Sequence, residues 1–172
     1  MAKSAVYESV ETNRERLIDL ATELWENPEL SLEEYEAATR LQGVLEEEGF
    51  EVESGVAGMD TAFVARYGDG DPVIGTMGEF DALPDLSQRR SAEREPVEEG
   101  APGHGCGHNL FGVASLGGAI AIKRAIDRGD ISGTVVYYGT PAEEIGVGKP
   151  YMVEAGAFDD VDAIVSWHPG WY

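Results

Sequence analysis

The sequence predicts an α/β fold in which a mixed β-sheet is flanked by helices. Segments with the three- and four-residue apolar spacing of helices alternate with short apolar runs that are typical of buried strands. Clusters of polar residues follow predicted strands or precede a helix, where open α/β sheets build their sites. The 172 residues are enough for one domain with a hydrophobic core.

Two helices are predicted at the start of the chain. Apolar residues recur at helical spacing from about residue 5 to 26, and Asn27-Pro28 ends the pattern. Ser31 and Glu34 have the spacing of a capping box, so Ser31 is predicted to cap a second helix that runs to Glu48 and stops at Gly49. The larger apolar residues of this region are expected in the core: Trp25, Tyr35, Leu41 and Leu45.

Alternation or apolar runs predict strands over residues 50–53, 61–67, 72–77, 134–139 and 161–166. The run 134–139 is apolar on both faces, which predicts a central, parallel strand, and 161–166 is expected to be buried as well. Helices are predicted over 110–128, with Asn109 as its cap, and over 149–154. Residues 85–100 lack an apolar period and are expected to form a long exposed loop.

The net charge of −21 comes from 33 acidic and 12 basic side chains. Such a surface repels nucleic acid and anionic membranes, which excludes both as partners. Strong acidity with only three lysines indicates adaptation to high salt, as in a halophilic protein; the alternative is an ordinary acidic cytosolic protein. A single cysteine, no apolar run of membrane length and no signal core predict a cytoplasmic location.

Three short clusters carry side chains that bind divalent transition metals: Cys106 and His108, the pair Glu143-Glu144, and His168. Cys106 and His108 are two residues apart within a glycine-rich loop and could bind one ion. Of two adjacent glutamates, one can bind metal while the other takes a proton from water. Glu143 is predicted to be this general base.

Each of these residues alone has a plainer interpretation. A lone cysteine is usually a small buried hydrophobic residue, and paired glutamates mean little in so acidic a chain. Their joint occurrence at strand ends favours a metal site. The chemical alternative is a Cys106/His108 catalytic pair without metal, which would leave Glu143-Glu144 without a role.

Four motifs resemble those of the aminoacylase/carboxypeptidase-type metal-dependent amidohydrolases, metallopeptidase relatives that include hippurate hydrolase and the indole-acetyl-amino-acid hydrolases. The motifs are Gly78–Pro84, Gly105–Asn109, Pro141–Glu144 and Trp167–Pro169. The first motif, together with residues 158–162, is most similar to the members that act on aminobenzoyl-glutamate. The resemblance extends from the N-terminal helices to the last residue.

This resemblance implies a zinc-peptidase fold with two divalent ions, zinc or manganese. It implies a ligand set of Cys106, His108, Glu144 and His168, with Glu143 as the general base. Asp81 is implied to lie beside the metals and to orient a ligand. Glu79 stands where some relatives have a ligand histidine, so its role stays open, as does that of His104.

The resemblance also implies that residues 1–172 are the N-terminal part of a longer catalytic domain. Family members continue with a lid and dimerisation domain, and then return to the catalytic domain with one more histidine ligand. The complete enzyme is expected to be a homodimer that hydrolyses the amide bond of N-acyl or N-aroyl amino acids, aminobenzoyl-glutamate among them. The chain alone is expected to be inactive unless a C-terminal polypeptide complements it. The alternatives are a non-catalytic remnant or partner subunit that needs a second polypeptide to complete the site, and a metal-independent binding module.

Overall fold

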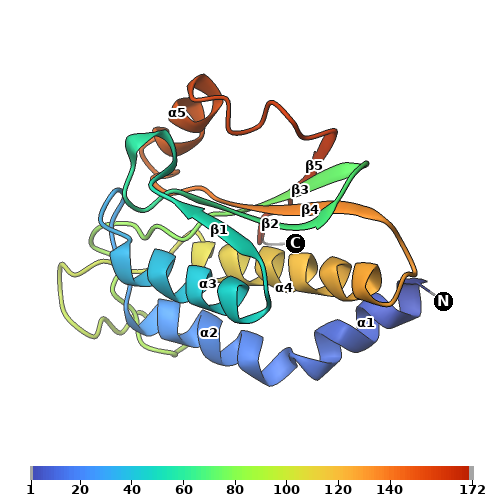
Figure 1. The fold of residues 1–172 in the computed structure, drawn as a ribbon. Coiled ribbons are helices and arrows are strands. Elements are labelled where there is room, and N and C mark those ends of the chain that lie inside the picture. Colours follow the sequence, from blue (N-terminus) through green and yellow to red (C-terminus); the bar gives the residue numbers. More distant parts are fainter. Residues whose placement is uncertain (1, 171–172) are drawn as a thin grey trace.

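The computed structural model describes residues 2–170, which form a mixed sheet with helices on both faces (Figure 1). Four helices cover one face: α1 (Ala2–Thr12), α2 (Arg14–Glu26), α3 (Tyr35–Glu47) and α4 (His108–Asp127). The short helix α5 (Gly148–Glu154) and a single 3₁₀ turn, η1 (Val56–Gly58), lie on the other face. The predicted α/β class with a mixed sheet is confirmed.

Within residues 2–170 the sheet contains β1 (Glu51–Ser54), β2 (Phe63–Asp69), β3 (Val73–Gly78), β4 (Gly133–Gly139) and β5 (Ala163–Val165), in the order β1-β2-β4-β3-β5. β4 is central and buried along its whole length, as predicted, but it is parallel only to β3 and runs antiparallel to β2. The expectation of a buried strand at 161–166 is wrong. β5 is the last strand in the sheet order, and 64% of Val165 is exposed there.

The central strand β4 inserts between two strands that are consecutive in sequence. Residues 70–72 link β2 to β3, and the start of β4 fits against this link. The Thr134 amide donates to the Pro72 carbonyl at 2.9 Å, and the Thr134 hydroxyl donates to the Gly70 carbonyl at 2.9 Å. Gly133 has φ 119°, and a Cβ there would lie 2.5 Å from the Pro72 oxygen, so only glycine fits.

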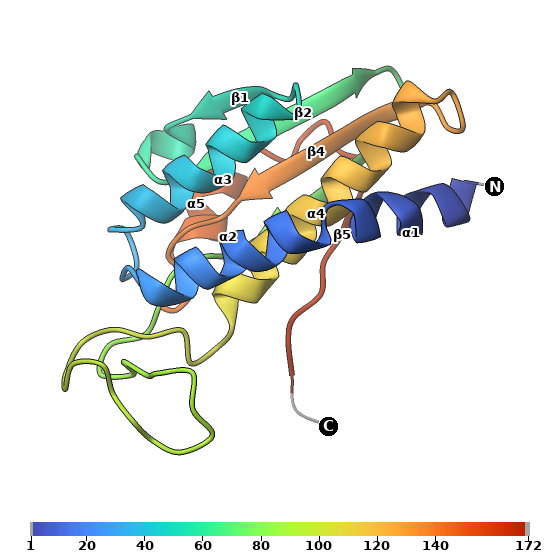
Figure 2. The same ribbon diagram turned by 90° about the horizontal axis from the view of Figure 1, so that it is seen from below.

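The predicted continuous helix over residues 5–26 is interrupted at Asn13. The Asn13 side-chain amide donates to the Ser9 carbonyl at 2.8 Å, which takes up an acceptor at the end of α1. The chain then starts α2 at Arg14. Both helices lie along α4 in Figures 1 and 2.

Two predicted helix caps are wrong. The carboxylate of Glu29, not Ser31, accepts the first free amides of α3, from Glu36 at 3.1 Å and Ala37 at 2.8 Å. Ser31 and Glu34 instead contact the functional site described below. The helix α4 begins at His108, so Asn109 lies inside it, and the buried Asn109 side-chain amide donates to the Ala21 carbonyl at 3.0 Å instead of capping the helix.

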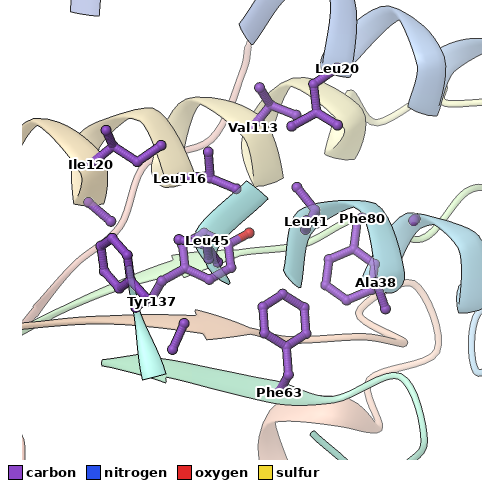
Figure 3. Packing of buried hydrophobic residues seen from close by; sticks show 14 of the residues in the cluster. Leu20, Ala38, Leu41, Leu45, Phe63, Phe80, Val113, Leu116, Ile120 and Tyr137 are labelled. Atoms are coloured by element: carbon purple, nitrogen blue, oxygen red, sulfur yellow. The ribbon is translucent and has the colours of Figure 1, made fainter. Parts of the chain in front are cut away.

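The main core lies between the helical layer and the sheet (Figure 3). Leu41 and Leu45 are fully buried, as predicted, and Trp25 is partly buried. Tyr35 is 53% exposed at the start of α3, so its assignment to the core is wrong. The rings of Phe63 and Tyr137 stack with centroids 5.7 Å apart and join β2 to β4.

Residues 85–100 form the predicted exposed loop, without helix or strand, and the loop projects away from the sheet and helices in Figure 2. Its base is closed by two hydrogen bonds between Leu83 and Gly103, of 2.9 and 3.1 Å. These bonds fix the point at which the chain turns toward Cys106. Among residues 2–170 no helix is both long and apolar enough to cross a membrane.

Candidate metal centre

The predicted site residues converge at one edge of the sheet. β3, β4 and β5 are mutually parallel in register, so their carboxyl ends share this edge. The segments that follow these strands carry Glu79 and Asp81, Glu143 and Glu144, and His168; the loop before α4 supplies Cys106 and His108. All six predicted residues and Glu79 therefore gather around His108.

His108 is the centre of the cluster and is fully buried. Its Nδ1 atom lies 2.8 Å from Asp81 Oδ1, and its Nε2 atom lies 2.9 Å from Glu79 Oε2. Burial alone would lower the pKa of His108, but the two carboxylates outweigh it and raise this pKa to about 10. The second oxygen of Asp81 accepts hydrogen bonds from the Ser31 hydroxyl at 2.8 Å and the Glu144 amide at 2.9 Å.

Glu79, whose role the sequence left open, lies inside the cluster with only 5% of its surface exposed. One carboxylate oxygen faces His108, and the other accepts a hydrogen bond from Lys149 of α5. Burial would raise the pKa of Glu79, but His108 and Lys149 outweigh it, so this pKa lies below its usual value. Sequence reasoning missed Lys149, although it is one of only three lysines in the chain.

Cys106 and His168 face each other, with Sγ and Nε2 3.4 Å apart. The other ring nitrogen of His168, Nδ1, donates to the Pro169 carbonyl at 2.7 Å, which leaves the Nε2 lone pair directed at Cys106. The indole N–H of Trp167 donates to the Ser115 hydroxyl at 3.2 Å and holds this segment on α4. Cys106 and His168 therefore present a sulfur and a nitrogen donor side by side.

The environment of Cys106 disfavours the metal-free Cys/His catalytic pair. Burial and then the carboxylates of Glu144, Glu143 and Glu79 raise the pKa of the thiol to about 11. A cysteine nucleophile requires the opposite shift, because the thiolate is the reactive form. A divalent cation would reverse this balance, since the same carboxylates would then surround a positive charge.

Glu143 and Glu144 differ in accessibility. The Glu143 side chain is 39% exposed, and its Oε2 atom is 3.8 Å from His108 Nε2. The Glu144 side chain is 15% exposed, and its Oε1 atom is buried without a hydrogen-bond partner among residues 2–170. Water can reach Glu143, whereas the Glu144 oxygen, which has no hydrogen bond within the described part of the chain and lies 3.8 Å from His108 Nδ1, is of the kind that a bound cation satisfies.

The donor atoms fit a divalent cation in two overlapping groups. Ligand atoms of Cys106, His108 and His168 lie within 4.8 Å of one another, and so do those of Glu79, His108 and Glu143. Asp81 is hydrogen-bonded to Nδ1 of His108, so only Nε2 of this ring can serve as a metal ligand. The single lone pair of Nε2 can bind one ion. A second ion would need other donors, and the unpaired Glu144 oxygen is available.

Metal binding by the chain is expected to release protons. His108 and Cys106 have pKa values of about 10 and about 11, so both are protonated at neutral pH in the metal-free chain, and a metal must displace these protons. Affinity should therefore rise with pH between about 6 and 9. Titration calorimetry at pH 7.5 in two buffers of different ionisation enthalpy should report about two protons released per ion; release of none would contradict this assignment.

Comparison with known proteins agrees with the site. Residues 75–171 match the model of "Peptidase family M20/M25/M40". Over 163 residues the chain is 45% identical to one of the subunits of p-aminobenzoyl-glutamate hydrolase from Escherichia coli K12, a match that covers 94% of this chain and 34% of that protein. It is 33% identical to N-acetylcysteine deacetylase of Bacillus subtilis, over 89% of this chain and 40% of that protein.

Solved structures share the fold. The Bacillus subtilis YXEP protein, described as a dinuclear metal binding peptidase from the M20 family, superposes with a TM-score of 0.80 at 32% identity, over 93% of this chain and 44% of that one. An aminobenzoyl-glutamate utilization protein from Klebsiella pneumoniae gives a TM-score of 0.71 at 18% identity, over 96% and 46%, and shows the fold alone. The chain spans about a third to two fifths of the length of the curated relatives it matches.

Proposed function

Because the chain belongs to peptidase family M20/M25/M40, we propose that the whole protein is a metal-dependent hydrolase of the amide bond in N-acyl and N-aroyl amino acids. Aminobenzoyl-glutamate is the proposed aroyl substrate, since the relative that is 45% identical is part of a hydrolase of that compound by name. The observation that carries the proposal is a water-accessible carboxylate, Glu143, beside a cluster of sulfur, imidazole and carboxylate donors centred on the buried His108.

The proposed ligands are Cys106, His108, Glu144 and His168, and the proposed ions are zinc or manganese, two in the complete enzyme. The donor distances support Cys106, His108 and His168, the buried Glu144 oxygen without a hydrogen bond from the described residues supports the fourth ligand, and a dinuclear relative of known structure supports two ions. When bound, such ions polarise an amide carbonyl and make water a stronger nucleophile at neutral pH. Asp81 would orient His108 by holding Nδ1, which directs Nε2 toward the metal.

Glu143 is the proposed general base and acid. Its carboxylate would take the proton of the attacking water and later deliver it to the nitrogen of the leaving amino acid. The Glu143 side chain is 39% exposed, which leaves room for water, and its Oε2 atom lies 3.8 Å from Nε2 of the buried His108. Lys149 would partly offset the negative charge of the cluster, since it pairs with the buried Glu79.

A substrate panel tests the proposal. The whole protein should release the amino acid from aminobenzoyl-glutamate, hippurate or N-acetyl amino acids, lose this activity with a chelator, and regain it with zinc or manganese. Glycylglycine, whose acyl group carries a free, charged amine, is the matched control and should be a poor substrate. Activity that survives complete removal of metal, or release only from glycylglycine, would refute the assignment.

A further polypeptide is proposed to complete the active protein. One relative is, by its name, a single subunit of a hydrolase, and the chain covers 34% of the length of that relative. Residues beyond this segment, a second subunit, or both are therefore expected to contribute to the active protein. We propose a homodimer for the complete enzyme. Light scattering of the whole protein without a second subunit should give twice the protomer mass, and any co-purified subunit should add its own mass; the mass of a monomer in an active sample would contradict the homodimer.

A salt-rich cytoplasm is the proposed setting. Screening of a net charge of −21 should raise the midpoint of thermal unfolding by at least about 5 °C between 0.1 and 2 M KCl, as read by circular dichroism. The exposed residues Glu15, Glu46 and Glu93 provide a control. Replacing all three with Gln should make the midpoint less salt-dependent. A midpoint that does not respond to salt would point to an ordinary acidic protein.

A further inference from the structure

We propose that the segment between α2 and α3, residues 31–34, positions the catalytic centre, and that Glu34 does so by holding the turn that carries Glu143. Glu34 is a positioning residue in this proposal, since it touches the backbone before Glu143 and not the reacting atoms. The inference rests on the function proposed above, which gives Glu143 and Glu144 their roles.

Glu34 is a carboxylate in the interior, with 0% of its surface exposed. Its Oε1 atom accepts a hydrogen bond from the Ala142 amide at 2.8 Å, across 108 residues of sequence. Its Oε2 atom accepts from the Thr61 hydroxyl at 3.0 Å. The two carboxylate oxygens of Glu34 therefore bind two different segments, the residues that precede β2 and the turn after β4.

The turn that Glu34 holds is strained. Ala142 has φ 55°, a left-handed conformation that residues with a Cβ adopt only at a cost, typically about 1 kcal/mol or more. Such a conformation persists when surrounding contacts over-determine it. Here the Ala142 amide is bound to Glu34, and its carbonyl accepts from the Val147 amide at 3.1 Å. The left-handed conformation of Ala142 sets the direction in which the chain after β4 continues to Glu143.

Ser31 supplies a second support from the same segment. Its hydroxyl donates to Asp81 Oδ2 at 2.8 Å, and that oxygen also accepts the Glu144 amide at 2.9 Å. The backbone is tied as well, because the Ala82 amide donates to the Glu29 carbonyl at 2.8 Å. The Glu143-Glu144 pair is therefore held at both ends by carboxylates, Glu34 before it and Asp81 at its second residue.

Helix capping does not explain Glu34. Glu29 already accepts hydrogen bonds from the first amides of α3, so the Glu34 side chain is not needed to cap this helix. Burial also raises the pKa of Glu34 despite its hydrogen bonds, so the interior disfavours the charged form of this carboxyl group. A side chain that served only to fill space at this position would be apolar, as it is elsewhere in the core.

Three variants of the chain separate positioning from packing. Glu34→Leu removes both acceptors at nearly constant volume, and Glu34→Gln keeps an acceptor for Ala142 and offers Thr61 an amide donor. The control is Glu33→Gln, one residue away and exposed. Hydrogen exchange by mass spectrometry on the metal-free chain reads the peptide 140–148. The absorption spectrum of added Co²⁺, with its thiolate charge-transfer band, reads the assembled site.

The Glu34→Leu variant is expected to exchange faster in peptide 140–148, and to bind Co²⁺ at least about tenfold more weakly with an altered spectrum, because loss of outer contacts costs about 10- to 100-fold in metal affinity. Glu34→Gln should restore most of both signals, and Glu33→Gln should match the wild type. Wild-type exchange and Co²⁺ binding in Glu34→Leu, or equal losses in Leu and Gln, would overturn the proposal. If the Leu variant fails to fold, Glu34→Met, which also removes both acceptors, takes its place: faster exchange supports the proposal, and unchanged exchange overturns it.

In the whole protein, Glu34→Leu should lower kcat with little change in KM, since Glu143 acts in the chemical step. If the wild-type protein hydrolyses no acyl amino acid, the proposed function fails. Hydrogen exchange and the Co²⁺ spectrum still decide whether Glu34 positions the site, because neither readout depends on turnover.

Discussion

Glu143→Gln in the whole protein is expected to lower kcat for amide hydrolysis by about 10²- to 10⁴-fold, the usual contribution of a general base. The amide has the shape of the carboxylate but cannot accept the proton of water. Because Glu143 is 39% exposed and lies outside the proposed ligand set, its replacement should leave metal content unchanged. Steady-state kinetics and metal analysis of the same preparation provide the measurement.

The matched control for this variant is Glu154→Gln, an exposed glutamate near the end of α5 that should behave as wild type. Turnover retained in Glu143→Gln would remove this residue as the base. Loss of metal together with activity would instead place Glu143 among the ligands, as its distance of 3.8 Å from His108 Nε2 allows. The two outcomes are distinct, so one preparation decides between a proton-transfer role and a coordination role.

The second large effect is expected from His108→Ala. His108 belongs to both groups of donor residues, so its removal should eliminate metal binding. Mass spectrometry of metal content on chains purified in molar salt without chelators should find near-stoichiometric metal in the wild type and almost none in the variant. The change also leaves the buried Asp81 without its basic partner and Glu79 with Lys149 alone, which should cost about 3–5 kcal/mol of stability.

His108→Asn controls for this loss of stability, because the asparagine amide can still contact Asp81 and the change removes less side-chain volume than His108→Ala. It should unfold less readily than the alanine variant and still lose metal. Metal retained in both variants would contradict the central role of His108. If the wild-type chain itself holds no metal, the described residues do not hold the ligands tightly enough by themselves, and the same comparison must be made on the whole protein.

The sequence predicted the α/β class and the convergence of Cys106, His108 and the glutamate pair, because strand ends and glycine-rich loops are local signals. It failed where a residue had two possible partners. Ser31 and Glu34 have the spacing of a helix cap, yet their partners, Asp81 and Ala142, are 50 and 108 residues away. No local pattern distinguishes these uses.

The position of a strand within the sheet was the other feature that could not be predicted from the sequence. Residues 161–166 have the composition of a buried strand, but burial depends on neighbours, and β5 is at an edge. Likewise Glu79 could not be assigned from sequence, because its role depends on Lys149, which comes 70 residues later on α5. Local propensity predicted which segments form strands, and tertiary contacts decided what lies beside them.

The insertion of β4 between β2 and β3 has a consequence for the order of assembly during synthesis. β2 and β3 emerge early, but the strand that joins them ends at Gly139, so the sheet cannot close until most of the chain has been made. Until then Phe63 lacks its partner Tyr137, and Glu34 lacks the amide that it binds. Folding dominated by such distant pairings is slow and leaves apolar surface open, so nascent chains shorter than about 140 residues should depend on chaperones.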